Sequence, residues 1–178
     1  MISLVTKADL DNYKYIADSV KNSVSWPQFV SEAQMLDVKS WLGDALLLEI
    51  IGQALTLPTT FSAANMKLLS GGTYTYQSKD YFFQGLRACI IYYAFGRFIN
   101  RTSVNFTAAG VVIKESDFSI PATDKQIQRM ETEANLTAEA LKCEIITFLN
   151  RNSTIYPLWS GCSSKDCTSS RPIIVMGD

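Results

Sequence analysis

Histidine is absent from this chain of 178 residues. The absence removes the commonest general base, the usual partner of a serine or cysteine nucleophile, and the commonest metal ligand in proteins. Carboxylates remain available, but the sequence pattern brings no two of Glu49, Asp80, Glu115 and Asp117 together. An enzyme that uses cysteine or carboxylate chemistry is therefore the weaker hypothesis, and we expect no catalytic residues.

The chain also lacks an excess of charge, because 16 basic residues balance 17 acidic ones. Tight binding of phosphate backbones needs a basic surface, so a small nucleic-acid-binding module is disfavoured. The most apolar stretch has only nine uncharged residues between Arg87 and Arg97, whereas a membrane span needs ~20. We expect no membrane span, and the charged residues Lys7 and Asp9 predict that no secretion signal begins the chain.

Recognisable metal and phosphate motifs are missing as well. Cys162 and Cys167 lie five residues apart in a serine-rich segment, whereas zinc sites usually combine two CxxC-like pairs. We interpret them as free thiols or an adventitious disulfide, and we expect Cys89 and Cys143 to be small buried hydrophobes. No Gly-Lys-Ser/Thr follows the glycine pair at 71–72, as a phosphate-binding loop requires. The sequence thus predicts no metal and no cofactor.

The residues that are present are organised around one stretch, from Ser78 to Thr102 (SKDYFFQGLRACIIYYAFGRFINRT). We predict a single long helix, with Ser78 as its N-cap, Asp80 in its first turn and Arg101 near its end. Its middle is apolar on nearly every side. The rest of the chain, or a neighbouring subunit, must therefore cover it.

A second long helix is predicted from about Asp124 to Asn152. Thr123 and Gln126 form a capping-box pattern before it. Apolar residues then recur at helical steps of three and four, at Ile127, Met130, Ala134, Ala138, Leu141, Ile145 and Phe148. We expect this stripe to pack antiparallel to the central helix.

Shorter helices are expected before the central one. A capping box of Thr6 and Asp9 predicts a helix to about Lys21, and Ser25 begins another that breaks at Gly43. Asp44 is predicted to cap a continuation, DALLLEIIGQ, whose residues are nearly all aliphatic and should be buried. A further short helix is predicted between Ser62 and the glycines at 71–72, and TYTYQ (73–77) has the alternation of an extended segment.

A β-hairpin is predicted at about 103–115. Val104 and Phe106 alternate on one strand and Val111 and Ile113 on the other, with a three-residue loop at 108–110. A two-stranded ribbon is only marginally stable alone in water. We therefore expect it to lie on a helix or to pair with another chain.

The last segment, residues 160–178, is predicted to be an extended C-terminal arm. Tyr156 and Trp159 precede it and can dock on the bundle, and Ile173-Ile174-Val175 forms a short β-prone run after a polar linker. Such a run can add to a neighbour's sheet. A tail that docks on its own subunit or stays disordered is the alternative. The predicted fold is mainly α: a helical domain of residues 1–159 around two long helices, with the inserted hairpin and the arm.

The order of these pieces resembles the head–tail connector, or adaptor, proteins of tailed phages, including those of crAss-like and other Bacteroidetes phages. The resemblance covers roughly residues 1–159. It is carried by the aromatic-rich G-L-x-x-x-I-x-Y-Y-A-F helix, the T-x-x-G-V-V hairpin and the closing Y-P-x-W. The cysteine-containing tail after Ser160 lies outside this pattern.

The resemblance implies a structural virion protein of the neck, made in the host cytoplasm. Such proteins form a ring, usually of twelve subunits, that binds beneath the portal protein, extends the DNA channel without gripping DNA, and receives the next neck or tail protein. We expect the hairpin and the arm to make contacts between subunits or with the portal, through Phe106, Val111, Ile113, Trp159, Ile173, Ile174 and Val175. Another neck or tail-completion protein, a stopper or a tail terminator, is the alternative.

Overall fold

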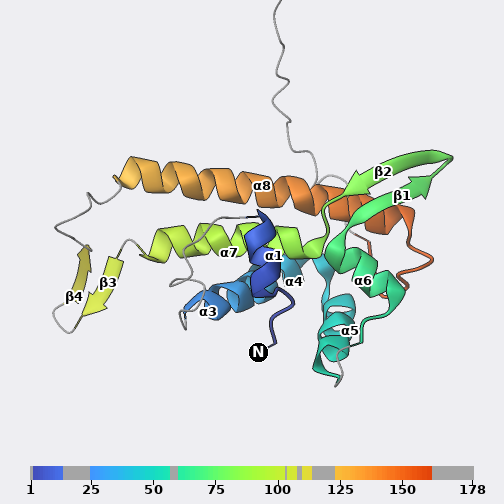
Figure 1. Cartoon of the computed structure of the whole chain (residues 1–178), viewed down its shortest axis with the longest axis horizontal. Helices are drawn as coiled ribbons and strands as arrows, with labels where there is room; N and C mark the ends of the chain where they lie inside the picture. The colour runs from blue at the N-terminus through green and yellow to red at the C-terminus, as the bar shows by residue number, and fades with distance from the viewer. Residues whose placement is uncertain are drawn as a thin grey trace, which may run out of the picture.

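The computed structural model describes residues 2–13, 25–56, 60–102, 104–107, 110–113 and 123–161 (Figure 1). This part of the chain is mainly helical, as predicted. In chain order its elements are α1 (Lys7–Tyr13), α3 (Ser25–Glu32), the π-helix η1 (Ala33–Val38), α4 (Lys39–Leu42), α5 (Asp44–Leu55), α6 (Ala63–Ser70), β1 (Gly72–Tyr76), β2 (Lys79–Phe83), α7 (Leu86–Thr102), β3 (Val104–Thr107), β4 (Gly110–Ile113) and α8 (Asp124–Arg151).

Two long helices, α7 and α8, run antiparallel along the length of the molecule, as predicted (Figure 1). They approach closely near Gly96, where an added Cβ would lie 2.8 Å from the Oδ1 atom of Asn135. Further along the pair, the Cys89 thiol contacts the carbonyl of Ala138 at 3.5 Å. Small residues on both helices thus let the two backbones come together.

The central helix is shorter than predicted, because residues 78–85 form the end of a turn, strand β2 and a two-residue connection instead. β1 pairs antiparallel with β2, from Tyr76 opposite Lys79 to Gly72 opposite Phe83. Gln77 and Ser78 connect the strands with positive φ angles of 49° and 61°, the backbone of a type I′ turn. Ser78 is therefore not an N-cap, and α7 begins only after Gly85. Its apolar middle is buried as expected, from Leu86 to Ala94 apart from half-buried Arg87 and Tyr92.

The second long helix agrees with the prediction. Thr123 and Gln126 form the expected capping box. The apolar stripe is buried from Ala134 to Phe148, whereas Ile127 is half-buried and Met130 is 45% exposed. The first two turns of α8 thus extend past the core.

The N-terminal segment is held on the bundle by a few polar contacts. The predicted capping box of α1 is present, with the Thr6 amide donating to Asp9 at 2.8 Å. Gln34 is wholly buried in η1; it accepts a hydrogen bond from the Leu4 amide at 2.8 Å and donates one to the Ile2 carbonyl at 3.0 Å. The expected continuation of α1 to residue 21 lies outside the described residues.

The helix that begins at Ser25 continues through the π-helical turn to Leu42, and Gly43 ends it with a φ of +84°, as predicted. Asp44 is not the cap of the next helix. It lies in the first turn of α5, where its carboxylate pairs with Lys39 at 3.3 Å. The prediction that the residues of DALLLEIIGQ (44–53) are buried is wrong in part, because Ala45 is exposed and Leu48 is 62% exposed.

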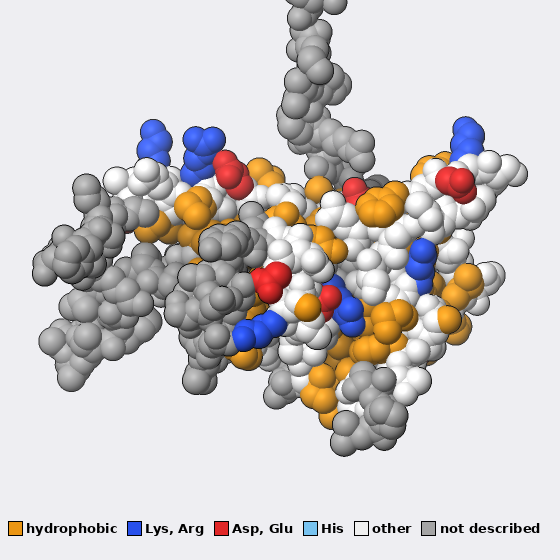
Figure 2. All heavy atoms as spheres, in the orientation of Figure 1, with side chains coloured by type: hydrophobic (Ala, Val, Ile, Leu, Met, Phe, Trp, Pro, Cys, Tyr) orange, Lys and Arg blue, Asp and Glu red, His pale blue; other side chains and the backbone are white. Residues whose placement is uncertain are grey.

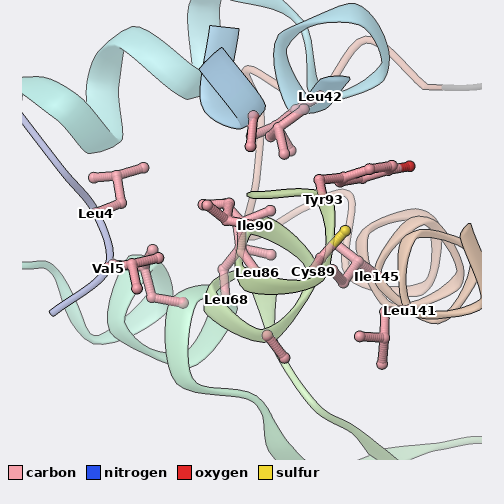
Figure 3. Close-up of a cluster of buried hydrophobic side chains, with 14 of the residues drawn as sticks. Leu4, Val5, Leu42, Leu68, Leu86, Cys89, Ile90, Tyr93, Leu141 and Ile145 are labelled. Atoms are coloured by element: carbon pink, nitrogen blue, oxygen red, sulfur yellow. The ribbon is translucent and has the colours of Figure 1, made fainter. Parts of the chain in front are cut away.

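The core lies where α7 is surrounded by the other helices (Figure 3). Leu4, Leu42, Leu68 and Leu141 reach it from four different parts of the chain. After α8 the chain turns back, and Tyr156 and Trp159 dock on the bundle as expected, with 3% and 7% exposure. Figure 3 shows that Leu4 and Leu42 lie on one side of α7, whereas Leu141 and Ile145 of α8 lie on the other.

The hairpin predicted at 103–115 is present as β3 and β4, with Val104 opposite Ile113 and Phe106 opposite Val111. Its connection is one residue shorter than predicted, because Gly110 pairs with Thr107 and so belongs to β4. A two-residue connection matches the twist of the flanking strands. Figure 1 places this hairpin at one end of the α7–α8 pair and the β1–β2 hairpin at the other.

Candidate functional site

A polar groove of about 340 Å³ lies between η1, α7 and α8. Arg97 of α7 is its central cation. The guanidinium donates to both carboxylate oxygens of Asp37, with Nε–Oδ2 and Nη2–Oδ1 distances of 2.9 and 2.8 Å. The groove is lined by Asp37, Tyr93, Arg97, Asn100, Arg101, Glu131, Asn135 and Glu139.

The charges of the groove are matched within the chain. Glu32 joins Arg97 to Arg101, with N–O distances of 3.6 and 2.8 Å. The hydrogen bond with Asp37 raises the pKa of Arg97 above its ordinary value. A bidentate arginine–carboxylate pair is strong and directional, so these contacts fix the π-helical turn of η1 against α7.

On the opposite wall of the groove, the Tyr93 hydroxyl donates to Glu139 of α8 at 2.5 Å. Burial, followed by this hydrogen bond, raises the pKa of Tyr93 far above its ordinary value. Lys142 pairs with the second oxygen of Glu139 at 3.0 Å. A tyrosine held neutral in this way donates a hydrogen bond but cannot serve as a base near neutral pH.

The contacts of this groove hold three helices together: η1, α7 and α8. Its lining has neither a serine nor a cysteine that a base could activate. No group of three potential metal ligands occurs within the described residues. Of the carboxylates considered from the sequence, Glu49 binds the Asn65 amide at 2.9 Å and Asp80 binds the Thr75 hydroxyl at 2.7 Å. Glu115 and Asp117 lie outside the described residues.

The β1–β2 hairpin presents an aromatic face to the end of α8. The Arg151 guanidinium lies 3.9 Å from the ring centre of Tyr81 and 5.0 Å from that of Tyr76. It also donates to the Tyr74 hydroxyl at 2.9 Å. Phe83 stacks on Phe148 with 4.1 Å between ring centres. Aromatic and cation–π contacts therefore fix the hairpin to the bundle.

The other face of the same hairpin is open. Register places Thr73 opposite Phe82 and Thr75 opposite Asp80 on that face, and Phe82 is 65% exposed. The sequence-based interpretation missed this hairpin. Its signals were the alternating TYTY segment and the aromatic-rich DYFF segment on either side of Gln77-Ser78, bounded by glycines at 71–72 and 85.

The predicted contact residues lie in three different situations. Phe106, Val111 and Ile113 belong to the β3–β4 hairpin at one end of the molecule (Figure 1). Trp159 is 7% exposed, and its indole donates to the side chain of Asn150 at 2.9 Å. Most of its surface is therefore buried within the subunit and is not accessible to a partner. The run 173–175 and the two cysteines at 162 and 167 lie outside the described residues.

The chain belongs to a protein family of unknown function, DUF6712, which matches residues 38–169. That match begins in η1 and includes α5, both hairpins, and the whole α7–α8 pair. No curated protein and no solved structure matches the chain. In the described part of the molecule, no helix has the length and apolar character to cross a membrane.

Proposed function

We propose that this protein is a structural component of the phage virion: an adaptor that forms a ring of twelve copies beneath the portal protein. The ring connects the head to the next neck or tail protein and extends the DNA channel. The proposal starts from the resemblance of the long helices, the hairpin and the closing Y-P-x-W to head–tail connectors. It includes no catalytic activity.

One observation of the structure carries the proposal furthest. The two ribbons lie at opposite ends of the α7–α8 pair (Figure 1), and each has only two strands among the described residues. Every strand therefore has one edge without a strand neighbour in this part of the chain. Two different ribbons at two ends supply the unlike surfaces that a closed, head-to-tail ring requires.

The charge of the chain also favours this role. With a formal net charge of −1, a ring of such subunits would not bind the phosphate backbone tightly, which suits a channel through which DNA must pass. The exposed apolar side chains, which include Leu48 and Phe82, are available for contacts between subunits. Monomeric proteins rarely expose large apolar patches, so exposed apolar side chains favour contacts with other chains.

Co-expression with the portal protein of the same phage, followed by electron microscopy, tests the proposal. A second ring stacked on the portal, with twelvefold symmetry, is the expected result. Absence of a complex with the portal, with the protein found farther down the neck, would overturn it in favour of a stopper or tail terminator.

The register of β3 and β4 offers a matched pair of variants for this experiment. Phe106 pairs with Val111 across the two strands, whereas Val112 pairs with Asn105. The double substitution Phe106→Asp, Val111→Asp should abolish the stacked ring if this pair makes the contact. Val112→Asp should leave the ring in place, and equal effects of both variants would contradict an assignment of the contact to Phe106 and Val111.

A further inference from the structure

An apolar groove lies along α5, at the junction with α4. Met35, Leu47, Leu48 and Ile51 line a hollow of about 50 Å³, and Lys39 and Asp44 complete its lining. Leu48 and, seven residues on, Leu55 extend the same helical stripe while 62% and 59% exposed. Figure 2 shows hydrophobic side chains gathered over the lower right of the molecule, where Figure 1 places α5 and α6.

The C-terminal part of the chain leaves the bundle beside this groove. The hydroxyl of Ser160 lies 3.8 Å from the position that a Cβ on Gly43 would take, and Gly43 immediately precedes Asp44 of the groove. Trp159, the residue before Ser160, is itself buried in the core. The point from which residues 162–178 continue is therefore fixed close to the α4–α5 junction.

The sequence of the arm fits the groove in chemistry. Its apolar run Ile173-Ile174-Val175-Met176 matches the aliphatic lining. The lining carries no net charge, because its one acid, Asp44, pairs with Lys39 of the same lining at 3.3 Å. The match between the run and the groove is therefore apolar.

We infer that residues 173–176 of one copy occupy the α5 groove of a second copy of this chain. In the same copy, Ser160 lies in space beside Gly43, which precedes Asp44 of the groove. Docking of the arm into the groove of its own copy would therefore need only a short connection. The linker of residues 161–172 would extend to ~40 Å, and as a flexible coil it would span about 20 Å. Its length suits a neighbouring groove.

The contact between the arm and the α5 groove would be one of the interfaces between subunits of the proposed ring. The inference rests on the proposed function for the way in which the copies are arranged. Arm and groove are different surfaces, so their contact is heterologous. Such a contact repeats from copy to copy until the ring closes. The apolar face of α5 would then be covered in the assembly and exposed only in the isolated subunit.

Photo-crosslinking of the full-length protein tests the inference. Benzoylphenylalanine replaces Ile174, heavy-isotope-labelled and unlabelled copies are mixed at the highest soluble concentration, and cross-linked peptides are identified by mass spectrometry. Links between labelled and unlabelled copies that join the arm to α5 are the expected result. Links only within one copy, links to other elements, or no links to α5 would overturn it.

A pair of leucine substitutions provides the matched control. Leu48→Asp places a charge in the groove and should lower the yield of mixed links to α5 by about tenfold or more. Leu136→Asp changes a leucine of α8 that is 66% exposed and should leave that yield unchanged. Circular dichroism checks that both variants fold. Mixed links that persist in Leu48→Asp would contradict the inference, whereas intact links without stacking on the portal would contradict only the proposed function.

Discussion

At the scale of single residues, two glycines close the base of the β1–β2 hairpin more tightly than a side chain permits. Gly71 and Gly85 have φ angles of +74° and +85°, and a Cβ on Gly85 would lie 2.4 Å from the Gly71 nitrogen. Gly85→Ala combines backbone strain with overlap. It should lower the free energy of unfolding by about 2–5 kcal/mol, as urea unfolding would measure.

Gly52 provides the control for this prediction. It lies within α5, and an added Cβ would meet nothing within 4 Å. Gly52→Ala should raise the free energy of unfolding by roughly 0.5–1 kcal/mol, because alanine loses less conformational entropy in a helix. Similar effects of the two substitutions would contradict the crowding described at Gly85.

Tyr156 predicts a dependence of stability on alkaline pH. Burial raises the pKa of this tyrosine to about 12, and its hydroxyl donates to the Ala64 carbonyl at 2.7 Å. Since the folded state favours the neutral phenol, the stabilisation is fully present below the ordinary pKa of 10 and is lost as pH rises from 10 towards 12.

Comparison with Tyr156→Phe isolates this contribution. The variant lacks the hydrogen bond and should be less stable by about 0.5–1.5 kcal/mol at neutral pH. The difference from the unmodified protein should shrink between pH 10 and about 12 as Tyr156 ionises. Unfolding by urea across this range measures it. A constant difference would show that the phenol ionises equally in the folded and unfolded states.

At the scale of elements, the stripe of α8 decides how strongly the two long helices hold together. Leu141 is 5% exposed on this stripe, so Leu141→Ala leaves a cavity and should cost about 2–5 kcal/mol of unfolding free energy. Leu136 is 66% exposed on the same helix, and Leu136→Ala should change it by less than about 0.5 kcal/mol. A near-zero effect at Leu141 would contradict its burial.

The β1–β2 hairpin depends on Arg151 in the last turn of α8. Arg151→Ala removes the cation from the faces of Tyr76 and Tyr81 and should weaken the docking of the hairpin by about 1–2 kcal/mol. Amide hydrogen exchange of residues 72–83 measures this, because docking protects those amides.

The control for this hairpin experiment is Arg129→Ala. The Arg129 side chain is 81% exposed and pairs with Glu133 on the surface of α8, so the substitution should leave exchange in the hairpin unchanged. Unchanged exchange in Arg151→Ala would mean that the stacking of Phe83 on Phe148 suffices to hold the hairpin.

At the scale of the whole molecule, the arm and the bundle should be separable. Deletion of residues 171–178 removes no residue of the described core, so thermal unfolding of the subunit should change little. Assembly should weaken strongly, because the apolar run is lost. Light scattering across a concentration series measures this, and unchanged self-association would contradict a role of the arm in assembly.

Much of this molecule could be predicted from short-range sequence rules. The capping boxes at Thr6 and Thr123, the break at Gly43 and the stripe of α8 all lie where the sequence placed them, because each depends on residues within a turn or two of one another. The predicted start of the central helix is wrong. Gln77 and Ser78 form a turn there that their residue types do not favour, and the aromatic residues of the hairpin are buried by packing against α8, which is distant in sequence.

The polar groove and the exposed face of α5 could not be predicted in this way. Asp37 and Arg97 are 60 residues apart in sequence, and no local pattern pairs them. Likewise, the leucines of α5 look alike in sequence, yet Leu47 is 1% and Leu48 is 62% exposed.

The sequence by itself thus determined the helical character of the chain, both ends of α8, the C-terminal end of α7, and the absence of histidine chemistry. Only the tertiary structure decided which apolar faces are covered, where the β1–β2 hairpin lies, and that Ser160 lies beside the junction of α4 and α5. The physical reason is one of range. Caps and helical periodicity are satisfied within a few residues, whereas burial and ion pairing depend on which distant segments the folded chain brings into contact.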